Sequence, residues 1–204
     1  GGTTRRAAKI VCLNADHPDI EEFIDWKVIE ENKVVALGKM GYSTDFNGEA
    51  YETVSGQNSN NSVRFTNAFM KKVTGEDPNP SWELTGRVDP NLNRTVNAKH
   101  LWKKFNYASW RCADPAPQFH DTINEWNTCP FGEDGKREDI VASNPCSEYH
   151  FLNDTACNLL SHNVVPYYDI ENEKFDLEGF VHAVSLAQIV LEATVHWGQF
   201  PTED

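Results

Sequence analysis

Apolar residues recur along this chain with two different periods, and each period predicts a kind of element. The helical period, with apolar residues three and four positions apart, is clearest over residues 98–112 and 177–196. Asp176 stands directly before the second stretch and can cap its amino end. Short apolar runs between polar turns instead predict buried strands at residues 9–13, 34–37 and 62–65.

Weaker patterns predict further elements between these. Asp16 can cap a helix that has Pro18 in its first turn, and Thr66 can cap a short helix that reaches Val73. Residues 82–88 are typical of one arm of a hairpin, whereas residues 139–152 read as strand and loop. Because strands and helices alternate, the pattern predicts an α/β fold with parallel strands.

The composition modifies this picture. Only 39% of the 204 residues are hydrophobic when glycine is left out, which is somewhat below the usual share of about 45–50%, a scale that also counts glycine. Long polar stretches at residues 56–61 and 89–97 account for much of the difference. This composition is typical of a loop-rich domain, and also of a segment whose apolar faces are completed by chain outside this sequence. We expect the second, with residues 1–204 as a single segment of a larger domain.

Charge and cysteine content exclude several classes of protein. The chain has 18 basic and 31 acidic residues and a formal net charge of −13, which argues against nonspecific binding to nucleic acid or to an anionic membrane. No uninterrupted apolar run of membrane-spanning length and no leader pattern is present, so we expect a cytoplasmic protein. Five cysteines without a C-x-x-C pair, and histidines without a ligand spacing, predict neither a disulfide framework nor a metal site.

The stretch around Cys146 holds the residues with the clearest chemistry. Asn144, Cys146 and Glu148 alternate, so in an extended segment an amide, a thiol and a carboxylate would lie on one side. Pro145 cannot donate to a strand ladder, which fits a strand end or a loop over a cavity. Taken alone, the spacing is more typical of a polar strand end with a buried cysteine acting as a small hydrophobe.

A family resemblance adds to this reading. The sequence Asn144-Pro145-Cys146-Ser147-Glu148, followed eleven residues after Cys146 by Cys157, resembles the finger-loop motif of ribonucleotide reductases. The proline and the spacing to Cys157 are similar to the cobalamin-dependent branch. Other blocks resemble the same family in the same order: Gly1–Ala8, Asp16–Ile24, Asn60–Arg64, Phe69-Met70, Cys112–Pro115, Gln118-Phe119, Thr122–Trp126 and Gln199–Thr202.

The resemblance implies a fold and an activity. The fold would be part of a ten-stranded α/β barrel in which a central finger loop carries the radical cysteine. The activity would be the reduction of ribonucleotides, expected to be diphosphates, to 2′-deoxyribonucleotides by a thiyl-radical mechanism. Adenosylcobalamin would be the cofactor, and this chain would act as part of a larger enzyme.

The resemblance also implies roles for individual residues. Cys146 would carry the thiyl radical, Glu148 would act as general base on the 3′-hydroxyl, and Asn144 would hold the sugar hydroxyls. Cys157 matches one member of the cysteine pair that supplies two electrons. Residues 1–8 resemble the end of the family's specificity loop, so Gly1, Gly2 and Arg5 are expected at the substrate.

The expected partners follow from the same resemblance. They are a ribonucleotide substrate, a deoxynucleotide effector, the remaining segments of the reductase, a thioredoxin-type or dithiol reductant, and a second copy in a homodimer. Two alternatives stay open at this point. One is a reductase with a different radical source, and the other is a non-catalytic nucleotide-binding relic of the family.

Overall fold

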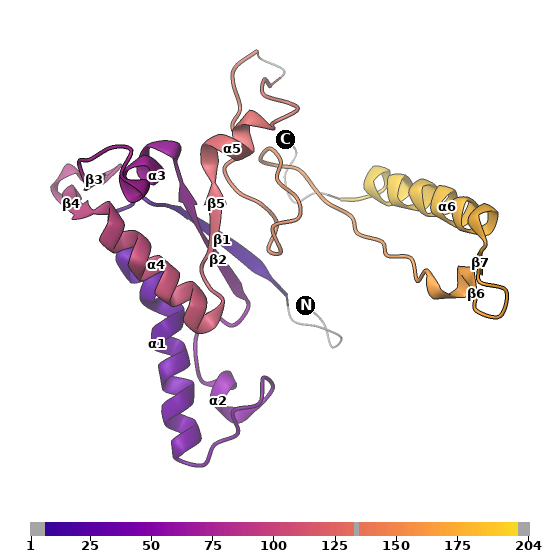
Figure 1. Ribbon diagram of the computed structural model, residues 1–204, viewed down its shortest axis with the longest axis horizontal. Helices are drawn as coiled ribbons and strands as arrows, with labels where there is room; N and C mark the ends of the chain where they lie inside the picture. Colours follow the sequence, from indigo (N-terminus) through magenta and orange to yellow (C-terminus); the bar gives the residue numbers. More distant parts are fainter. Residues whose placement is uncertain (1–6, 133–134, 200–204) are drawn as a thin grey trace. The chain divides into compact units, whose positions relative to one another are not determined.

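The computed structural model describes residues 7–132 and 135–199 and divides the chain into two compact units, Gly1–Asn153 and Asp154–Asp204 (Figure 1). The strands and helices of the first unit are β1 (Lys9–Asn14), α1 (Ile20–Lys39), α2 (Glu49–Glu52), β2 (Ser59–Phe65), α3 (Asn67–Thr74), β3 (Ser81–Leu84), β4 (Arg94–Asn97), α4 (Ala98–Cys112), β5 (Ala116–Phe119) and α5 (His120–Glu125), with a 3-10 turn at Pro90–Leu92.

Three parallel strands form the sheet that organises the first unit. Their order is β1-β2-β5, with Cys12 opposite Ser62 and Ser62 opposite Ala116. The strands β3 and β4 form a separate antiparallel pair. Parallel strands joined through helices confirm the predicted α/β class, since such crossovers place helices on the faces of the sheet.

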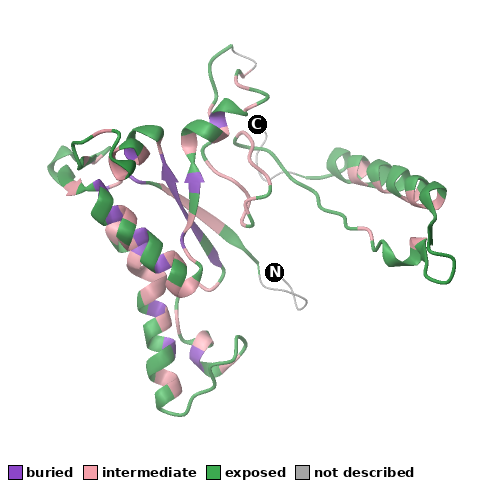
Figure 2. Cartoon of the chain, in the orientation of Figure 1, coloured by how far each residue is buried: buried purple, intermediate pink, exposed green. Residues whose placement is uncertain are grey.

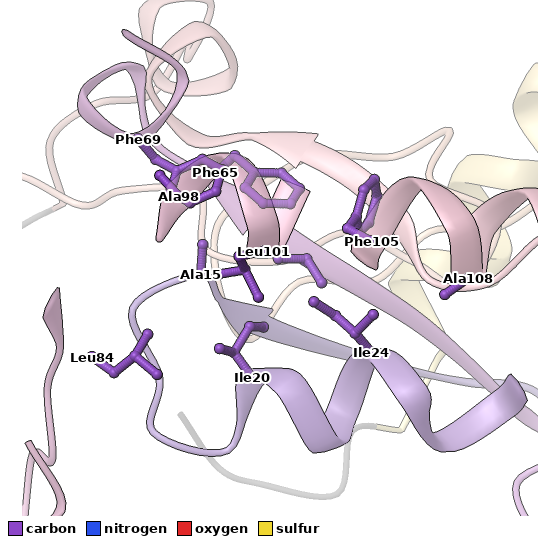
Figure 3. Close-up of a cluster of buried hydrophobic side chains, with 11 residues drawn as sticks. Ala15, Ile20, Ile24, Phe65, Phe69, Leu84, Ala98, Leu101, Phe105 and Ala108 are labelled. Carbon is purple, nitrogen blue, oxygen red and sulfur yellow. The ribbon is translucent and has the colours of Figure 1, made fainter. Parts of the chain in front are cut away.

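One face of this sheet is apolar and is covered by α1 and α4. Figure 2 shows buried positions along β2 and along the facing sides of these helices. Phe65 of β2 is 1% exposed and packs against three aromatic rings whose centroids lie 5.0 to 5.1 Å away. Figure 3 shows the cluster, which comprises Ala15, Ile20, Ile24, Val63, Phe65, Phe69, Leu84, Ala98, Leu101, Phe105 and Ala108.

A side-chain cap marks the start of α3, and an ion pair joins α1 to α4. Thr66 accepts a hydrogen bond from the backbone N–H of Phe69 at 3.2 Å, so the predicted cap of α3 is confirmed. Between α1 and α4, Lys104 Nζ lies 2.7 Å from a carboxylate oxygen of Asp25. Such a partly exposed pair contributes about 1 kcal/mol or less, so the apolar cluster is the main source of stability.

Two predictions for the region before β2 were wrong. Residues 34–37, expected as a strand, lie inside α1, where Val34 is 3% exposed and continues the buried stripe of Ile20 and Ile24. Asp16 does not cap that helix, which begins after Asp19. Instead, Asp16 Oδ1 accepts a hydrogen bond from Arg87 at 2.9 Å.

The second unit contains a short hairpin and one long helix. Its elements are a 3-10 turn (Val165–Tyr167), β6 (Tyr168–Asp169), β7 (Lys174–Phe175) and α6 (Leu177–His196). Asp176 Oδ1 accepts from the backbone N–H of Gly179 at 3.0 Å, which confirms the predicted cap of α6. By length and composition α6 could cross a membrane, and no residue of it is buried among the described residues. Core helices of soluble proteins also meet these two criteria, so length and composition alone do not show that α6 spans a membrane.

Candidate active site

A tight turn presents Cys146. The backbone N–H of Ser147 donates to the carbonyl oxygen of Asn144 at 2.9 Å, which places Pro145 and Cys146 at the two central positions. Ser147 follows with a φ of 61°, in the left-handed region. We call Asn144–Ser147 the Cys146 turn.

Two further hydrogen bonds close the loop behind this turn. The backbone N–H of Asn144 donates to Tyr149 O at 3.2 Å, and the backbone N–H of Tyr149 donates to Asn144 Oδ1 at 3.0 Å. Ser143 and His150 form an antiparallel bridge next to them. Cys146 therefore lies at the tip of a short hairpin-like loop, with its thiol exposed.

The expectation of an extended segment here was wrong. Asn144, Cys146 and Glu148 alternate in sequence, but a turn separates them, and the side-chain oxygen of Asn144 bonds to the loop's own backbone. The physical reason is Pro145, whose fixed φ favours the first central position of a β-turn. Cys146 and Glu148 are both exposed, and Asn144 is partly buried.

A polar pocket of about 380 Å³ lies beside the Cys146 turn. Its walls come from the amino-terminal half of β2, from the turn that precedes β5, and from Pro145, Cys146 and Ser147. Asn61, 1% exposed, contributes an Nδ2 that has no hydrogen-bond partner among the described residues. Three sequence blocks that resemble the reductase family, around residues 60–64, 112–115 and 144–148, thus meet at one pocket.

Burial sets the electrostatics around this pocket. Removal from water raises the pKa of Asp114, although the Asn61 backbone N–H and the charge of Lys27 act in the opposite direction. Burial likewise raises the pKa of the Cys12 and Cys112 thiols. Because the thiolate is the reactive form of cysteine, a raised pKa makes these two thiols less reactive.

A buried cluster on the other face of the sheet was not assigned a role from the sequence. Arg64 of β2 and Gln118 of β5 are 2% and 3% exposed, and Arg64 donates to Gln118 Oε1 at 2.8 Å. The only sign of this cluster in the sequence was the presence of polar residues within short strands. What they contact could not be inferred, because their partners lie far away in the sequence.

The remaining predicted residues are distributed as follows. Gly1, Gly2 and Arg5 lie outside the described residues. Cys157 belongs to the second unit and is exposed. Within residues 7–132 and 135–199, no group of three or more histidine, cysteine or acidic side chains could hold a metal ion.

Comparison with known proteins identifies the family. The whole chain, residues 1–204, matches the family described as "Ribonucleotide reductase, barrel domain". The chain therefore belongs to the ribonucleotide reductase family, and the predicted family resemblance is confirmed.

Individual relatives carry a more specific name. The chain is 44% identical over 206 residues to the vitamin B12-dependent ribonucleotide reductase of Streptomyces coelicolor, covering 100% of this chain and 20% of the relative. It is 38% identical over 271 residues to the protein of the same name from Bradyrhizobium diazoefficiens, covering 100% and 21%. A vitamin B12-dependent ribonucleoside-diphosphate reductase from Thermoplasma acidophilum is 30% identical over 202 residues, covering 99% and 22%. The chain thus spans about a fifth of the length of these relatives.

Proposed function

We propose that this chain is the part of an adenosylcobalamin-dependent ribonucleotide reductase that carries the radical cysteine. The observation that supports this most directly is the position of Cys146, exposed at the tip of a hydrogen-bonded turn and lining a polar pocket. The family supports the reaction class, and the names of the relatives support the cofactor. The enzyme would act in the cytoplasm, and the rest of its polypeptide would complete the site.

Cys146, Glu148 and Asn144 would have separate tasks in this reaction. As a thiyl radical, Cys146 Sγ would take the hydrogen atom from C3′ of the substrate ribose and later return it. Glu148 would accept the proton of the 3′-hydroxyl while the 2′-hydroxyl, protonated by a thiol of the reducing cysteine pair, leaves as water. Since Asn144 Oδ1 already accepts from Tyr149, its Nδ2 is the group that would donate to a sugar hydroxyl.

The overall reaction needs two electrons and two protons. We propose that Cys157 supplies one thiol of the pair that provides them, and that this pair ends as a disulfide. A thioredoxin-type or dithiol reductant would then restore both thiols. We further propose that Gly1, Gly2 and Arg5 contact the substrate, that a deoxynucleotide effector controls this contact, and that the complete enzyme is a homodimer.

The cofactor would supply the oxidising radical that converts the Cys146 thiol into a thiyl radical. The exposed thiol at the turn is compatible with this role, because a reactant from outside the chain can reach it. We assign no residue of this chain to holding the corrin ring.

The test is the reduction of a ribonucleoside diphosphate by the complete reductase, with adenosylcobalamin and a dithiol, and with deoxyribonucleotide as the measured product. Cys146→Ser should give no product above background, whereas Cys129→Ser, a matched change at another exposed cysteine, should keep the parental rate. Equal rates for Cys146→Ser and the parent would overturn the mechanism. Activity without cobalamin would favour a different radical source, and a parent inactive under all conditions would favour a nucleotide-binding relic.

A further inference from the structure

The face of the sheet turned away from α1 and α4 is polar, and it contacts the segment that leads to Cys146. Side chains alternate between faces along a strand. Val63 and Phe65 of β2 join the apolar cluster, so Asn60 and Arg64 belong to the opposite face, and register places Gln118 of β5 beside Arg64. We call this the polar face.

The first contact of this polar face is with the backbone of Ile140. A terminal nitrogen of Arg64 donates to Ile140 O at 2.6 Å, and the side chain of Asn124 bonds to both backbone groups of Ile140 at 2.8 and 3.1 Å. Ile140 itself is 3% exposed. The chain is therefore fixed six positions before Cys146.

The second contact is a directional chain of hydrogen bonds. A guanidinium group can only donate, so Arg64 fixes Gln118 with its Oε1 toward the arginine. Gln118 Nε2 then donates to Ser143 Oγ at 2.8 Å. The Ser143 hydroxyl is in turn 2.9 Å from Asn144 O, the acceptor of the Cys146 turn, and 3.2 Å from Ser147 Oγ.

The third contact reaches the turn itself. Asn60 Nδ2 donates to Pro145 O at 2.8 Å, and this carbonyl belongs to the peptide bond that joins Pro145 to Cys146. Asn60 thus binds the backbone of the turn directly, and Gln118 reaches it through the Ser143 hydroxyl.

We propose that Gln118 is a positioning residue for the radical cysteine, oriented by Arg64 and acting through Ser143, with Asn60 as a second support. This rests on the proposed function, because it takes Cys146 as the reacting group. A displacement of about 1 Å can reduce an enzyme's rate about a hundredfold, so the loss of one support should lower turnover.

Three variants of the complete reductase test the link between Gln118 and Ser143. Gln118→Glu keeps the size and the acceptor for Arg64, but a carboxylate cannot donate to Ser143. Ser143→Ala removes the hydroxyl, and Ser143→Thr retains it. We expect kcat to fall about tenfold to a hundredfold in the first two variants, with KM within about twofold of the parent. The double variant should be no slower than the slower single variant, and Ser143→Thr should recover most of kcat.

A second measurement does not depend on catalysis. The alkylation rate of Cys146 by iodoacetamide, followed by peptide mass spectrometry, should rise several-fold in Gln118→Glu and Ser143→Ala. It should stay parental in Asn47→Asp, a matched charge change at an exposed loop position. An unchanged alkylation rate in both variants would overturn the proposal. So would a loss of activity that appears mainly in KM and that Ser143→Thr does not recover. If Cys146→Ser stays active, the proposed function fails, but the alkylation rates still report on the positioning.

Discussion

The backbone N–H of Asn61 donates to Asp114 Oδ2 at 2.9 Å, which joins the start of β2 to the turn before β5. The other oxygen of this carboxyl group is buried and has no partner among the described residues. One oxygen of the Asp114 carboxyl group therefore accepts a hydrogen bond, whereas the other is buried away from water without a donor among the described residues.

This contact predicts a pH-dependent effect of Asp114→Asn. Burial raises the folded-state pKa of Asp114, so the folded chain holds this proton at pH values where the unfolded chain has released it. The parent therefore loses stability as pH rises from the ordinary pKa of aspartate through the raised value. Asparagine does not titrate, so the stability of the variant relative to the parent should increase as pH rises over that range. Melting temperatures across that range test this, and an advantage that shrinks with rising pH would contradict it.

The cap of α3 predicts a moderate loss of stability. Thr66→Ala removes the oxygen that accepts from Phe69 N, which should lower the free energy of unfolding by about 1 kcal/mol. Thr66→Ser retains the acceptor and should lie close to the parent. Chemical denaturation of the three proteins measures both differences, and equal losses for alanine and serine would show that the hydroxyl is not responsible.

The aromatic cluster predicts a larger loss. Phe65 is 1% exposed and touches the rings of Phe69, Trp102 and Phe105. Phe65→Ala should therefore cost about 3–5 kcal/mol. Val88, which is 98% exposed, is the control, and Val88→Ala should change stability by less than about 0.5 kcal/mol.

Two substitutions at Asn144 separate its two roles. Asn144→Asp keeps an acceptor for the Tyr149 N–H but lacks the amide donor, whereas Asn144→Ala loses both. We expect kcat of the complete reductase to fall at least about tenfold in each variant. Iodoacetamide should alkylate Cys146 faster only in the alanine variant, because only that variant loses the hydrogen bond from the Tyr149 N–H that closes the loop. Faster alkylation of the aspartate variant would show that the donor also holds the turn.

The helices α4 and α6 could be predicted because their signals are local. The periods over residues 98–112 and 177–196 match α4 and α6, and the polar groups that cap α3 and α6 are adjacent to them in sequence. Residues 34–37 were misread because four apolar residues look alike in a strand and in a continuing helix.

The site was predictable only in part. Cys146 and its neighbours stand out as a motif, but the turn depends on Pro145, whose effect on the backbone outweighs the alternation of residues around it. The bond between Arg64 and Gln118 joins residues 54 positions apart, through the register of two parallel strands. No local pattern encodes that register, so the support beneath the turn emerges only in the folded chain.

The alternation along β2 has a consequence for how this protein can change. Val63 and Phe65 seal the helices to the sheet, while the residue between them, Arg64, holds the segment that leads to Cys146. Inserting or deleting one residue in β2 would exchange these two sets of side chains, sending the guanidinium into the apolar cluster and the aromatic ring toward the turn. The stability of the fold and the position of Cys146 therefore both depend on the register of β2, and a shift in that register would change both together.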